Sequence, residues 1–281
     1  MLDKSFPKFS VLMAVYLKDN PDYLREAIDS LLNQTLLPNE IVVVRDGPIT
    51  EELQKVLDEE KEKFPNLVIT GYEENKGFGL ACRFGVEHCK YDVIARMDSD
   101  DVSSPDRFEK QMKCLLEKKV DIVGSWSYIF DQDINNPFAV REPPVEHEDI
   151  VKFAKGRAPF IHPTIFAYKK TFTDCGNYND WRLCEDFDLF VRMLEHGSKG
   201  YNIPEYLYNT REDKNFYKRR GGLKYAKGIV AFKKMLYKKH WLTRWQYFKT
   251  KWSTIIVALL PNFLRVFIYK KFLRQKPADK K

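Results

Sequence analysis

The sequence predicts an α/β fold: a mainly parallel sheet flanked by helices, followed by a basic helical extension at the C-terminus. Over the first 125 residues, short apolar runs typical of buried strands alternate with segments of helical periodicity. Repeated βα units of this kind form a parallel sheet with helices on both faces. The 281 residues suffice for one large α/β domain, or for one domain with an appendage.

The individual elements follow from periodicity and turn residues. Residues 9–16 form an apolar run, and Asn20-Pro21 then supplies a cap and a first-turn proline for a helix that reaches Leu32. Further strands are expected at 40–44, 67–72, 91–97 and 121–130, with helices at 51–63, 79–88 and 105–118. Residues 137–180 are less regular, which suits substrate-facing loops, and another helix begins at Glu185.

Three carboxylates follow the strand predicted at 91–97. Asp98, Asp100 and Asp101 lie within four positions, and they repel one another unless solvent, basic groups or a cation compensate. Carboxylate oxygens suit Mg2+ or Mn2+, and a cation held there would carry a phosphorylated ligand. The alternative is an acidic turn that caps the next helix, and for an isolated Asp-x-Asp this is the more frequent case. Both interpretations stay open for Asp101, ahead of the helix expected near Pro105.

The place of this cluster in the fold favours the cation. Open α/β sheets bind ligands at the carboxyl ends of their strands. Tyr16, Asp46 and the segment 98–101 all follow predicted strands. Their loops therefore converge if the sheet forms as expected.

Five segments of the chain form an ordered set of motifs: 9–16, 40–47, 75–77 (Asn-Lys-Gly), 97–101 (Met-Asp-Ser-Asp-Asp) and 185–189 (Glu-Asp-Phe-Asp-Leu). They occur in the order found in family 2 glycosyltransferases of GT-A fold, which residues 8–215 resemble. The patterns at 46–50 (Asp-Gly-Pro-Ile-Thr), 162–164 (His-Pro-Thr) and 219–222 (Arg-Arg-Gly-Gly) are similar to bacterial amylovoran, capsule and O-antigen glycosyltransferases. The resemblance implies transfer of a sugar from a nucleotide sugar, with inversion at the anomeric carbon.

The resemblance also implies a role for each matching residue. Asp46 would accept a hydrogen bond from the uracil imide N–H. Asp98 and Asp100 match the family's Asp-x-Asp and would hold Mn2+ or Mg2+, with Asp100 as the better candidate for direct contact; the cation would neutralise charge on the departing diphosphate. Asp186 matches the general base, and Glu185 would contact the acceptor or orient its neighbour. The nucleotide-sugar site would comprise Ala14, Val15, Tyr16, Asp46, Lys76, Gly77, Asp98 and Ser99.

Five basic or titratable positions keep more than one interpretation. Arg45 stands where many members of the family have aspartate. Arg83 is one position out of register with the family's arginine, so it either contacts the nucleotide or lies on a helix surface. His162 either contacts the acceptor or donor sugar or is a structural histidine. Arg219 and Arg220 either clamp a diphosphate or simply begin the basic tail.

The net charge of +7 hides a strong asymmetry. Residues 211–281 hold 21 Lys/Arg and three acidic residues, a balance of +18, which leaves −11 for residues 1–210. Aromatic and aliphatic residues interleave with this basic charge, as in a helix lying on an anionic membrane, with Trp241, Trp245 and Trp252 as anchors. The alternative is an extension packed on the body. The apolar run around 252–260 is shorter than the roughly 20 residues that span a bilayer.

We therefore expect two parts in the chain. Residues 1–215 would be the glycosyltransferase domain, with a nucleotide-binding half at 1–125 and an acceptor-binding half at 126–215. Residues 216–281 would be a basic amphipathic tail that associates with membrane.

The expected function is a metal-dependent, inverting glycosyltransferase of bacterial surface polysaccharide synthesis. UDP-galactose is the first choice of donor, followed by UDP-GlcNAc or UDP-glucose, and the acceptor would be a saccharide linked to a polyprenyl diphosphate. The five cysteines show no metal-ligand spacing, their odd count indicates reduced thiols, and residues 1–8 show no secretory signal. We thus expect a cytoplasmic protein, peripheral on the inner face of the plasma membrane.

Two other classes of function fit the sequence less well. A nucleotidyltransferase usually has a glycine-rich, basic phosphate loop after its first strand, and residues 15–21 contain no glycine. A nucleic-acid-binding protein could use the aromatic and basic tail to stack bases, but the acidic body would repel a polyanion. No nucleic acid partner is expected.

Overall fold

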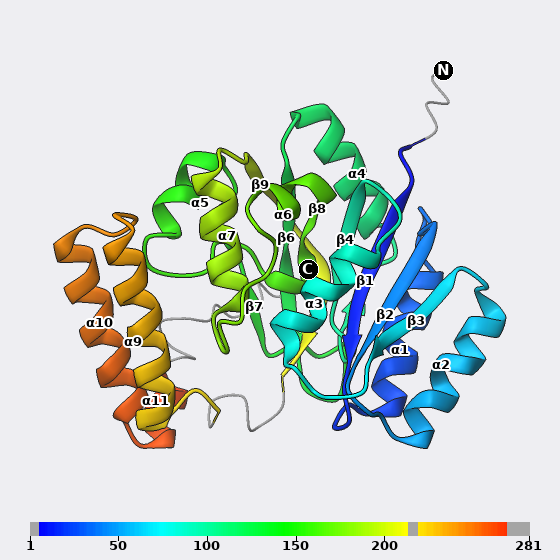
Figure 1. Ribbon diagram of the computed structural model, residues 1–281, viewed down its shortest axis with the longest axis horizontal. Helices are drawn as coiled ribbons and strands as arrows, with labels where there is room; N and C mark the ends of the chain where they lie inside the picture. The colour runs from blue at the N-terminus through cyan, green and yellow to red at the C-terminus, as the bar shows by residue number, and fades with distance from the viewer. Residues whose placement is uncertain (1–5, 213–218, 269–281) are drawn as a thin grey trace.

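The computed structural model describes residues 6–212 and 219–268 (Figure 1). Its amino-terminal half is a parallel sheet in the order β3-β2-β1-β4. The strands are β1 (Phe9–Val15), β2 (Glu40–Asp46), β3 (Leu67–Tyr72) and β4 (Val93–Met97). β1, β2 and β4 are buried runs of β-branched and apolar residues, whereas β3, at the edge of the sheet, is only partly buried.

Helices cover both faces of this sheet, which confirms the predicted fold class. One core cluster joins the sheet to α1 (Pro21–Leu32), α2 (Glu51–Lys63) and α4 (Arg107–Lys118). A second cluster, on the other face, includes α3 (Phe78–His88). The predicted cap of α1 is present, since the Asn20 side chain accepts the backbone N–H of Asp22 at 2.8 Å.

The sheet continues into the second half of the chain through antiparallel pairing. β8 (Phe166–Tyr168) pairs with β4 on one side and with β6 (Ile122–Phe130) on the other. β9 (Gly200–Arg211) runs parallel to β6 and pairs with the short β5 (Val102–Ser103), while β7 (Ala139–Arg141) pairs with β6. This half also contains α5 (His147–Phe153), η1 (His162–Thr164), α6 (Lys169–Asp174) and α7 (Glu185–Glu195).

The basic extension forms α9 (Gly222–Lys238), α10 (Arg244–Leu259) and α11 (Asn262–Ile268). Phe232 and Leu236 of α9 are buried in a third core cluster with Val191 of α7, so the extension packs on the body. Trp241 belongs to this contact, because its indole N–H donates to the carbonyl of Ala154 at 3.0 Å. Trp241, which the sequence suggested as a membrane anchor, is thus partly buried against the body. Within the described residues, no helix combines the length and the apolarity needed to cross a bilayer.

Candidate active site

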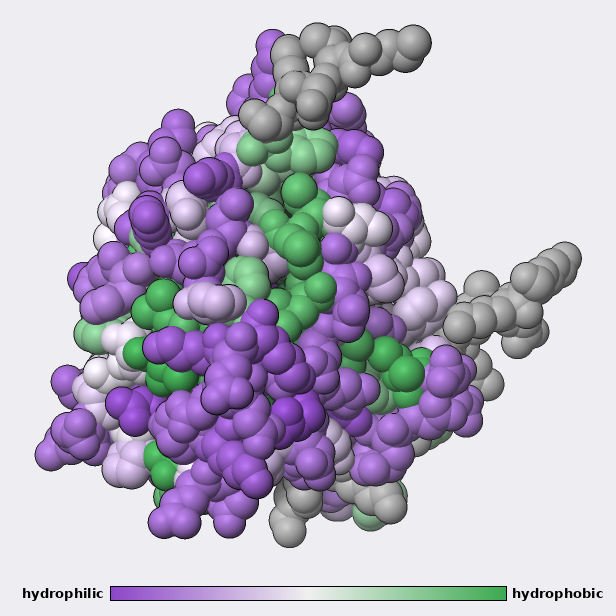
Figure 2. All heavy atoms as spheres, turned by 90° about the vertical axis from the view of Figure 1, so that its right-hand side faces the viewer, coloured by the Kyte–Doolittle hydropathy of each residue, from purple (hydrophilic) through white to green (hydrophobic). Residues whose placement is uncertain are grey.

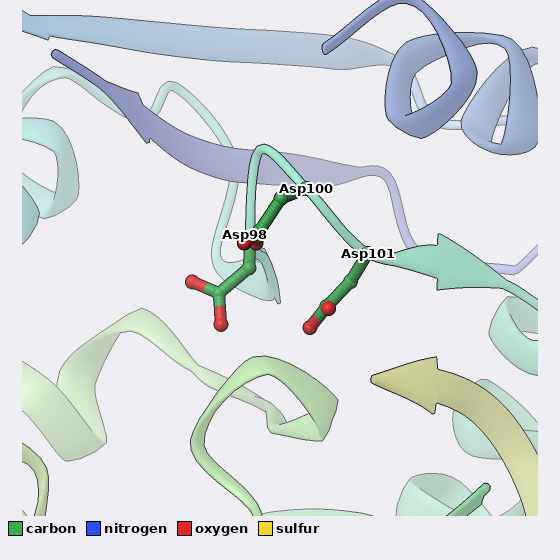
Figure 3. Close-up of side chains that lie close together, drawn as sticks. All are labelled: Asp98, Asp100 and Asp101. Atoms are coloured by element: carbon green, nitrogen blue, oxygen red, sulfur yellow. The ribbon is translucent and has the colours of Figure 1, made fainter. Parts of the chain in front are cut away.

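The three carboxylates after β4 come together on one turn. Oxygen atoms of Asp98, Asp100 and Asp101 lie within 4.8 Å of one another. Figure 3 shows the three side chains on the same side of the turn between β4 and β5. Asp101 is buried, Asp100 is exposed and Asp98 is intermediate. The turn thus presents oxygen ligands to a position open to solvent.

Burial and mutual repulsion disfavour the ionised form of the carboxylates at this turn. Burial, followed by the charges of Asp98 and Asp19, raises the pKa of Asp100 to about 7, although part of its side chain faces solvent. Burial and the charge of Asp100 also raise the pKa of Asp101. Asp19 is a fourth carboxylate, with a pKa raised to about 6, chiefly by burial. A divalent cation with hard oxygen preference fits this donor set, since its charge would favour the ionised carboxylates.

Asp19 ties the turn to the end of β1. Its Oδ2 accepts the Ser99 hydroxyl at 2.9 Å and the Tyr16 backbone N–H at 3.1 Å. The end of β1 and the Asp98–Asp101 turn are thereby held together. Asp19 was not among the predicted site residues, because it lies in a loop with no motif around it.

Arg96 supports the turn from beneath. Its side chain is 1% exposed and forms an ion pair with Asp98. Its guanidinium carbon lies 4.6 Å from the centre of the Phe78 ring, at the start of α3. Arg96 therefore fixes Asp98 with a buried counter-charge.

Arg211, the last residue of β9, holds the turn from the other side. Its Nε donates to the Asp100 carbonyl at 2.8 Å, and its backbone N–H donates to Asp101 Oδ1 at 2.7 Å. The guanidinium carbon lies 3.9 Å from the centre of the Tyr23 ring and 4.4 Å from that of Phe130. Asp101 therefore fastens the turn to β9, and the capping position of α4 belongs to Asp106 instead.

The Asn-Lys-Gly turn at 75–77 is built around Asp46. Asp46 accepts the backbone N–H groups of Lys76 at 2.8 Å and Gly77 at 3.1 Å, and the Asn75 amide at 3.0 Å. Gly77 has φ of +100°, a conformation that favours glycine. The Lys76 ammonium lies 4.7 Å from the centre of the Tyr72 ring. Asp46 is 5% exposed, so its main observed role is to order this turn.

The remaining nucleotide candidates lie beside Asp46. Ala14 pairs with Val44 and Val15 with Arg45 across the parallel β1 and β2 strands. Tyr16 follows β1 and is 42% exposed. Burial raises the pKa of Tyr16, and the positive charge of Arg219 opposes this shift. The predicted residues at the ends of β1 and β2 are thus neighbours, and Arg219 is near them.

Glu185 and Asp186 begin α7 and face partly buried surroundings. Burial raises the pKa of Asp186, while the charges of Arg141 and Arg220 oppose this rise. Burial, followed by the charge of Asp186, raises the pKa of Glu185 to about 7. Glu185 Oε2 is buried and has no hydrogen-bond partner among the described residues. A carboxylate with a raised pKa is a better proton acceptor near neutral pH, so this pair can do general-base chemistry.

The starts of α3 and α7 lie against each other. A Cβ atom built at Gly79 would come within 2.9 Å of Glu185 Cβ and 3.2 Å of the Asn179 carbonyl oxygen. Only glycine leaves room for Glu185 at this point. No sequence pattern points to this contact, because it joins two segments more than 100 positions apart.

Two other candidates have structural partners. Arg83 donates to the carbonyls of Gly176 at 3.3 Å and Tyr178 at 3.0 Å, so it fastens a loop to α3. The His162 ring nitrogen lies 2.7 Å from the Tyr178 hydroxyl, and burial lowers the pKa of His162. Its ring meets that of Phe78 edge to face at 5.6 Å. His162 is thus a neutral residue beneath the site, at 8% exposure.

The sheet, the Asp-x-Asp turn after β4 and the carboxylates at the start of α7 are together typical of GT-A glycosyltransferases. Residues 10–176 match the family model described as glycosyl transferase family 2, and the chain belongs to that family. Two relatives are similar over nearly their whole length. One, from Escherichia coli, is named UDP-Gal:alpha-D-GlcNAc-diphosphoundecaprenol beta-1,3-galactosyltransferase. It is 35% identical over 274 residues, 96% of this chain and 98% of the relative. The other is the amylovoran biosynthesis glycosyltransferase AmsE of Erwinia amylovora. It is 32% identical over 266 residues, 94% of this chain and 98% of the relative.

Solved structures support the fold independently. S. aureus TarS residues 1–349, determined with UDP-GlcNAc, aligns with a TM-score of 0.64 at 15% identity, over 95% of this chain and 71% of that one. A mannosyltransferase of Pyrobaculum calidifontis, in complex with GDP-Man and Mn2+, aligns with a TM-score of 0.61 at 16% identity. That match covers 84% of this chain and 65% of the other. The predicted family and the predicted GT-A fold are both confirmed.

Proposed function

We propose that this protein transfers a sugar from a UDP-sugar, with inversion, during synthesis of a bacterial surface polysaccharide. The observation that carries the proposal is the presence of two carboxylate clusters, the Asp98–Asp101 turn and the Glu185–Asp186 pair, in which burial raises the pKa values of Asp100, Glu185 and Asp186. Similarity to the E. coli galactosyltransferase over nearly the full length supports UDP-galactose as the donor. UDP-GlcNAc and UDP-glucose are the next candidates.

In the proposed reaction, Asp98 and Asp100 would hold Mn2+ or Mg2+, which would supply Lewis acidity to neutralise charge on the departing nucleoside diphosphate. Arg96 and Arg211 keep the turn in place, Arg96 through its ion pair with Asp98 and Arg211 through the Asp100 carbonyl. Tyr16, Asp46 and the turn at 75–77 line the nucleotide, with Arg219 as a positive charge near Tyr16.

Asp186 takes the proton from the acceptor hydroxyl as that oxygen attacks the anomeric carbon from the face opposite the diphosphate. Arg141 and Arg220 keep Asp186 ionised more readily than burial alone would allow. Glu185 positions the acceptor or Asp186.

The proposed acceptor is a saccharide joined to a polyprenyl diphosphate, by analogy with the E. coli relative. Such an acceptor is embedded in the bilayer through its lipid. The proposed location is accordingly the inner face of the plasma membrane, with the basic extension as the part that meets the anionic surface.

A donor screen in Mn2+ tests the reaction. UDP-galactose, UDP-GlcNAc and UDP-glucose are each offered with GlcNAc-diphosphate on a short alkyl chain, which is soluble without membrane. Transfer from one donor, abolished by EDTA and restored by Mn2+, is the expected result.

The variants Asp100→Asn and Asp186→Asn should each lose at least about 100-fold in kcat, since both remove groups that act on the reacting atoms. Asp106→Asn is the matched control, because the Asp106 side chain is 42% exposed and forms a surface ion pair with Lys110. Full activity of either site variant, or full activity in EDTA, would remove that residue or the metal from the scheme.

A further inference from the structure

The outer face of α10 is an apolar stripe that the described part of the chain leaves uncovered. It is formed by Trp245, Phe248, Trp252, Ile256 and Leu259, which recur every three or four residues. Residues at this spacing share one side of a helix. Trp245 is 76% exposed, Trp252 55% and Ile256 59%. Large apolar side chains this exposed, and contiguous, mark an interaction surface.

The opposite side of α10 is the one packed on the protein. Tyr247 and Ala258 are buried there. The buried Lys233 of α9 donates to the carbonyl of Thr250 at 2.9 Å and to the hydroxyl of Thr254 at 2.6 Å. The stripe consequently faces away from the body.

The turn at Pro261 extends the apolar surface onto α11. Phe263 is 71% exposed and Phe267 is 56% exposed. In Figure 1, α11 lies at the lower left, at the end of the molecule toward which β1 runs. The Asp98–Asp101 turn follows β4, which is parallel to β1, so it lies at that same end. Figure 2, which views the molecule from the side away from α10, shows a mainly hydrophilic surface interrupted by several apolar patches.

Charge identifies the kind of partner. Residues 219–268 contain twelve Lys/Arg and no Asp or Glu. Arg244, Lys249 and Lys251 lie on α10 itself, and the Lys251 ammonium is 5.5 Å from the centre of the Trp252 ring. Apolar side chains beside a basic surface, with tryptophans at the boundary, suit the headgroup region of an anionic bilayer. A second copy pairing through the same face would bring like charges together, which disfavours it.

We propose that the stripe on α10 and the exposed phenylalanines of α11 insert into the headgroup region of an anionic membrane. The insertion brings the end of the sheet with the Asp-x-Asp turn near the bilayer surface, where a lipid diphosphate lies. The placement of the Asp-x-Asp turn near a lipid diphosphate rests on the proposed function, whereas membrane binding by this face does not.

Flotation with vesicles tests the surface directly. The full-length protein is mixed with phosphatidylglycerol/phosphatidylethanolamine vesicles and with phosphatidylcholine vesicles. Trp252→Glu combined with Phe263→Glu should lower binding to the anionic vesicles by at least about tenfold, because each glutamate places a charge in the apolar layer. Leu37→Glu is the matched control: Leu37 is 53% exposed, lies in the loop after α1, and should leave binding unchanged. Circular dichroism and thermal melting verify that all variants fold.

Several outcomes would overturn the proposal. These are equal flotation of the double variant and the wild type, equal binding to neutral and anionic vesicles, or an absence of binding together with a dimer that the two glutamates dissociate. The last result would assign the face to a second copy of the chain.

Activity separates this inference from the proposed function. The double variant should keep wild-type transfer to the short-chain soluble acceptor and lose at least about tenfold with an acceptor anchored in vesicles. Loss with both acceptors would show that the face serves folding or catalysis, and would overturn the membrane role. Wild-type protein that floats but transfers no sugar would refute the proposed reaction and leave the membrane surface standing.

Discussion

Removing the side chain of Arg211 should weaken the binding of Mn2+ although Arg211 is not a ligand. Arg211 donates two hydrogen bonds to the Asp98–Asp101 turn, one from its Nε to the Asp100 carbonyl and one from its backbone N–H to Asp101 Oδ1. The variant Arg211→Met keeps the backbone contact and deletes the guanidinium. The substitution therefore removes the side-chain contact with Asp100, together with the other contacts of the guanidinium, and keeps the backbone contact with Asp101.

The magnitude follows from the interactions that the guanidinium makes. The guanidinium donates to the Asp100 carbonyl at 2.8 Å, a hydrogen bond from a charged donor worth about 1.5–3 kcal/mol, and to the Asp131 carbonyl at 3.4 Å, which at that length adds little. Two ring contacts add about 0.5–1 kcal/mol each. The ion pair with the half-exposed Glu26 adds about 0–1 kcal/mol. Because methionine keeps part of the packing against the two rings, we expect a decrease of about 2–4 kcal/mol in the free energy of unfolding. If about 1.4 kcal/mol of the hydrogen bond is used to position Asp100, Mn2+ affinity falls about tenfold.

Calorimetric titration of Mn2+ into the protein without donor measures this affinity, and urea unfolding measures the stability. Arg211→Lys should be intermediate, because lysine keeps the charge without the planar fork. Glu26→Gln is the control: it removes only the exposed ion pair and should leave Mn2+ affinity unchanged. A folded Arg211→Met protein with wild-type Mn2+ affinity would refute the reasoning.

Three further variants test the neighbourhood of α3 and α7. Burial raises the pKa of Glu185 from 4.5 to about 7, so the folded protein favours the protonated form and loses stability as pH rises between these two values. Glu185→Gln should therefore stabilise the protein by about 1–3 kcal/mol at pH 8 and by nearly nothing at pH 4. An equal effect of the substitution at both pH values, measured by urea unfolding, would contradict this. Arg83→Met should lower the free energy of unfolding by about 1–2 kcal/mol, because it removes two hydrogen bonds, and should leave the KM for the donor unchanged. A tenfold rise in that KM at unchanged stability would instead assign Arg83 to the nucleotide site. Gly79→Ala should displace Glu185 and lower kcat at least about tenfold. The control Gly156→Ala should leave kcat unchanged, because its added Cβ would meet no atom closer than 4.0 Å. Equal kcat in the two variants would mean that the start of α7 shifts without affecting catalysis.

The sequence was sufficient for the sheet, most helices and the acidic turn, because these depend on local periodicity and on residues that follow one another. The strand predicted at 91–97 is observed at Val93–Met97, and the helix predicted from Pro105 begins at Arg107. Boundaries moved by two residues because turns and strand ends are set by tertiary contacts.

The groups that support the site could not be predicted in the same way. Arg211 is 111 positions from Asp100 and carries no motif, so only the pairing of β9 with β5 and β6 reveals it. Arg96 is a basic residue inside an apolar strand, and that unusual position was the signal from which its buried contact with Phe78 could have been suspected. Arg83 shows the converse, since an arginine one position out of register with the family's arginine holds a loop here.

The division of charge between body and extension gains a physical role once the two proposals are combined. Residues 1–210 carry −11, and the carboxylates at the end of β4 and the start of α7 lie in that body. An acidic site approaching an anionic bilayer is repelled over a distance of about 8–10 Å at physiological salt. Residues 211–281, at +18, reverse the sign of the interaction on the side where α10 and α11 lie. The extension can then hold the acidic end of the sheet at the bilayer. Basic residues are not needed at the Asp98–Asp101 turn itself, where they would compete with the cation.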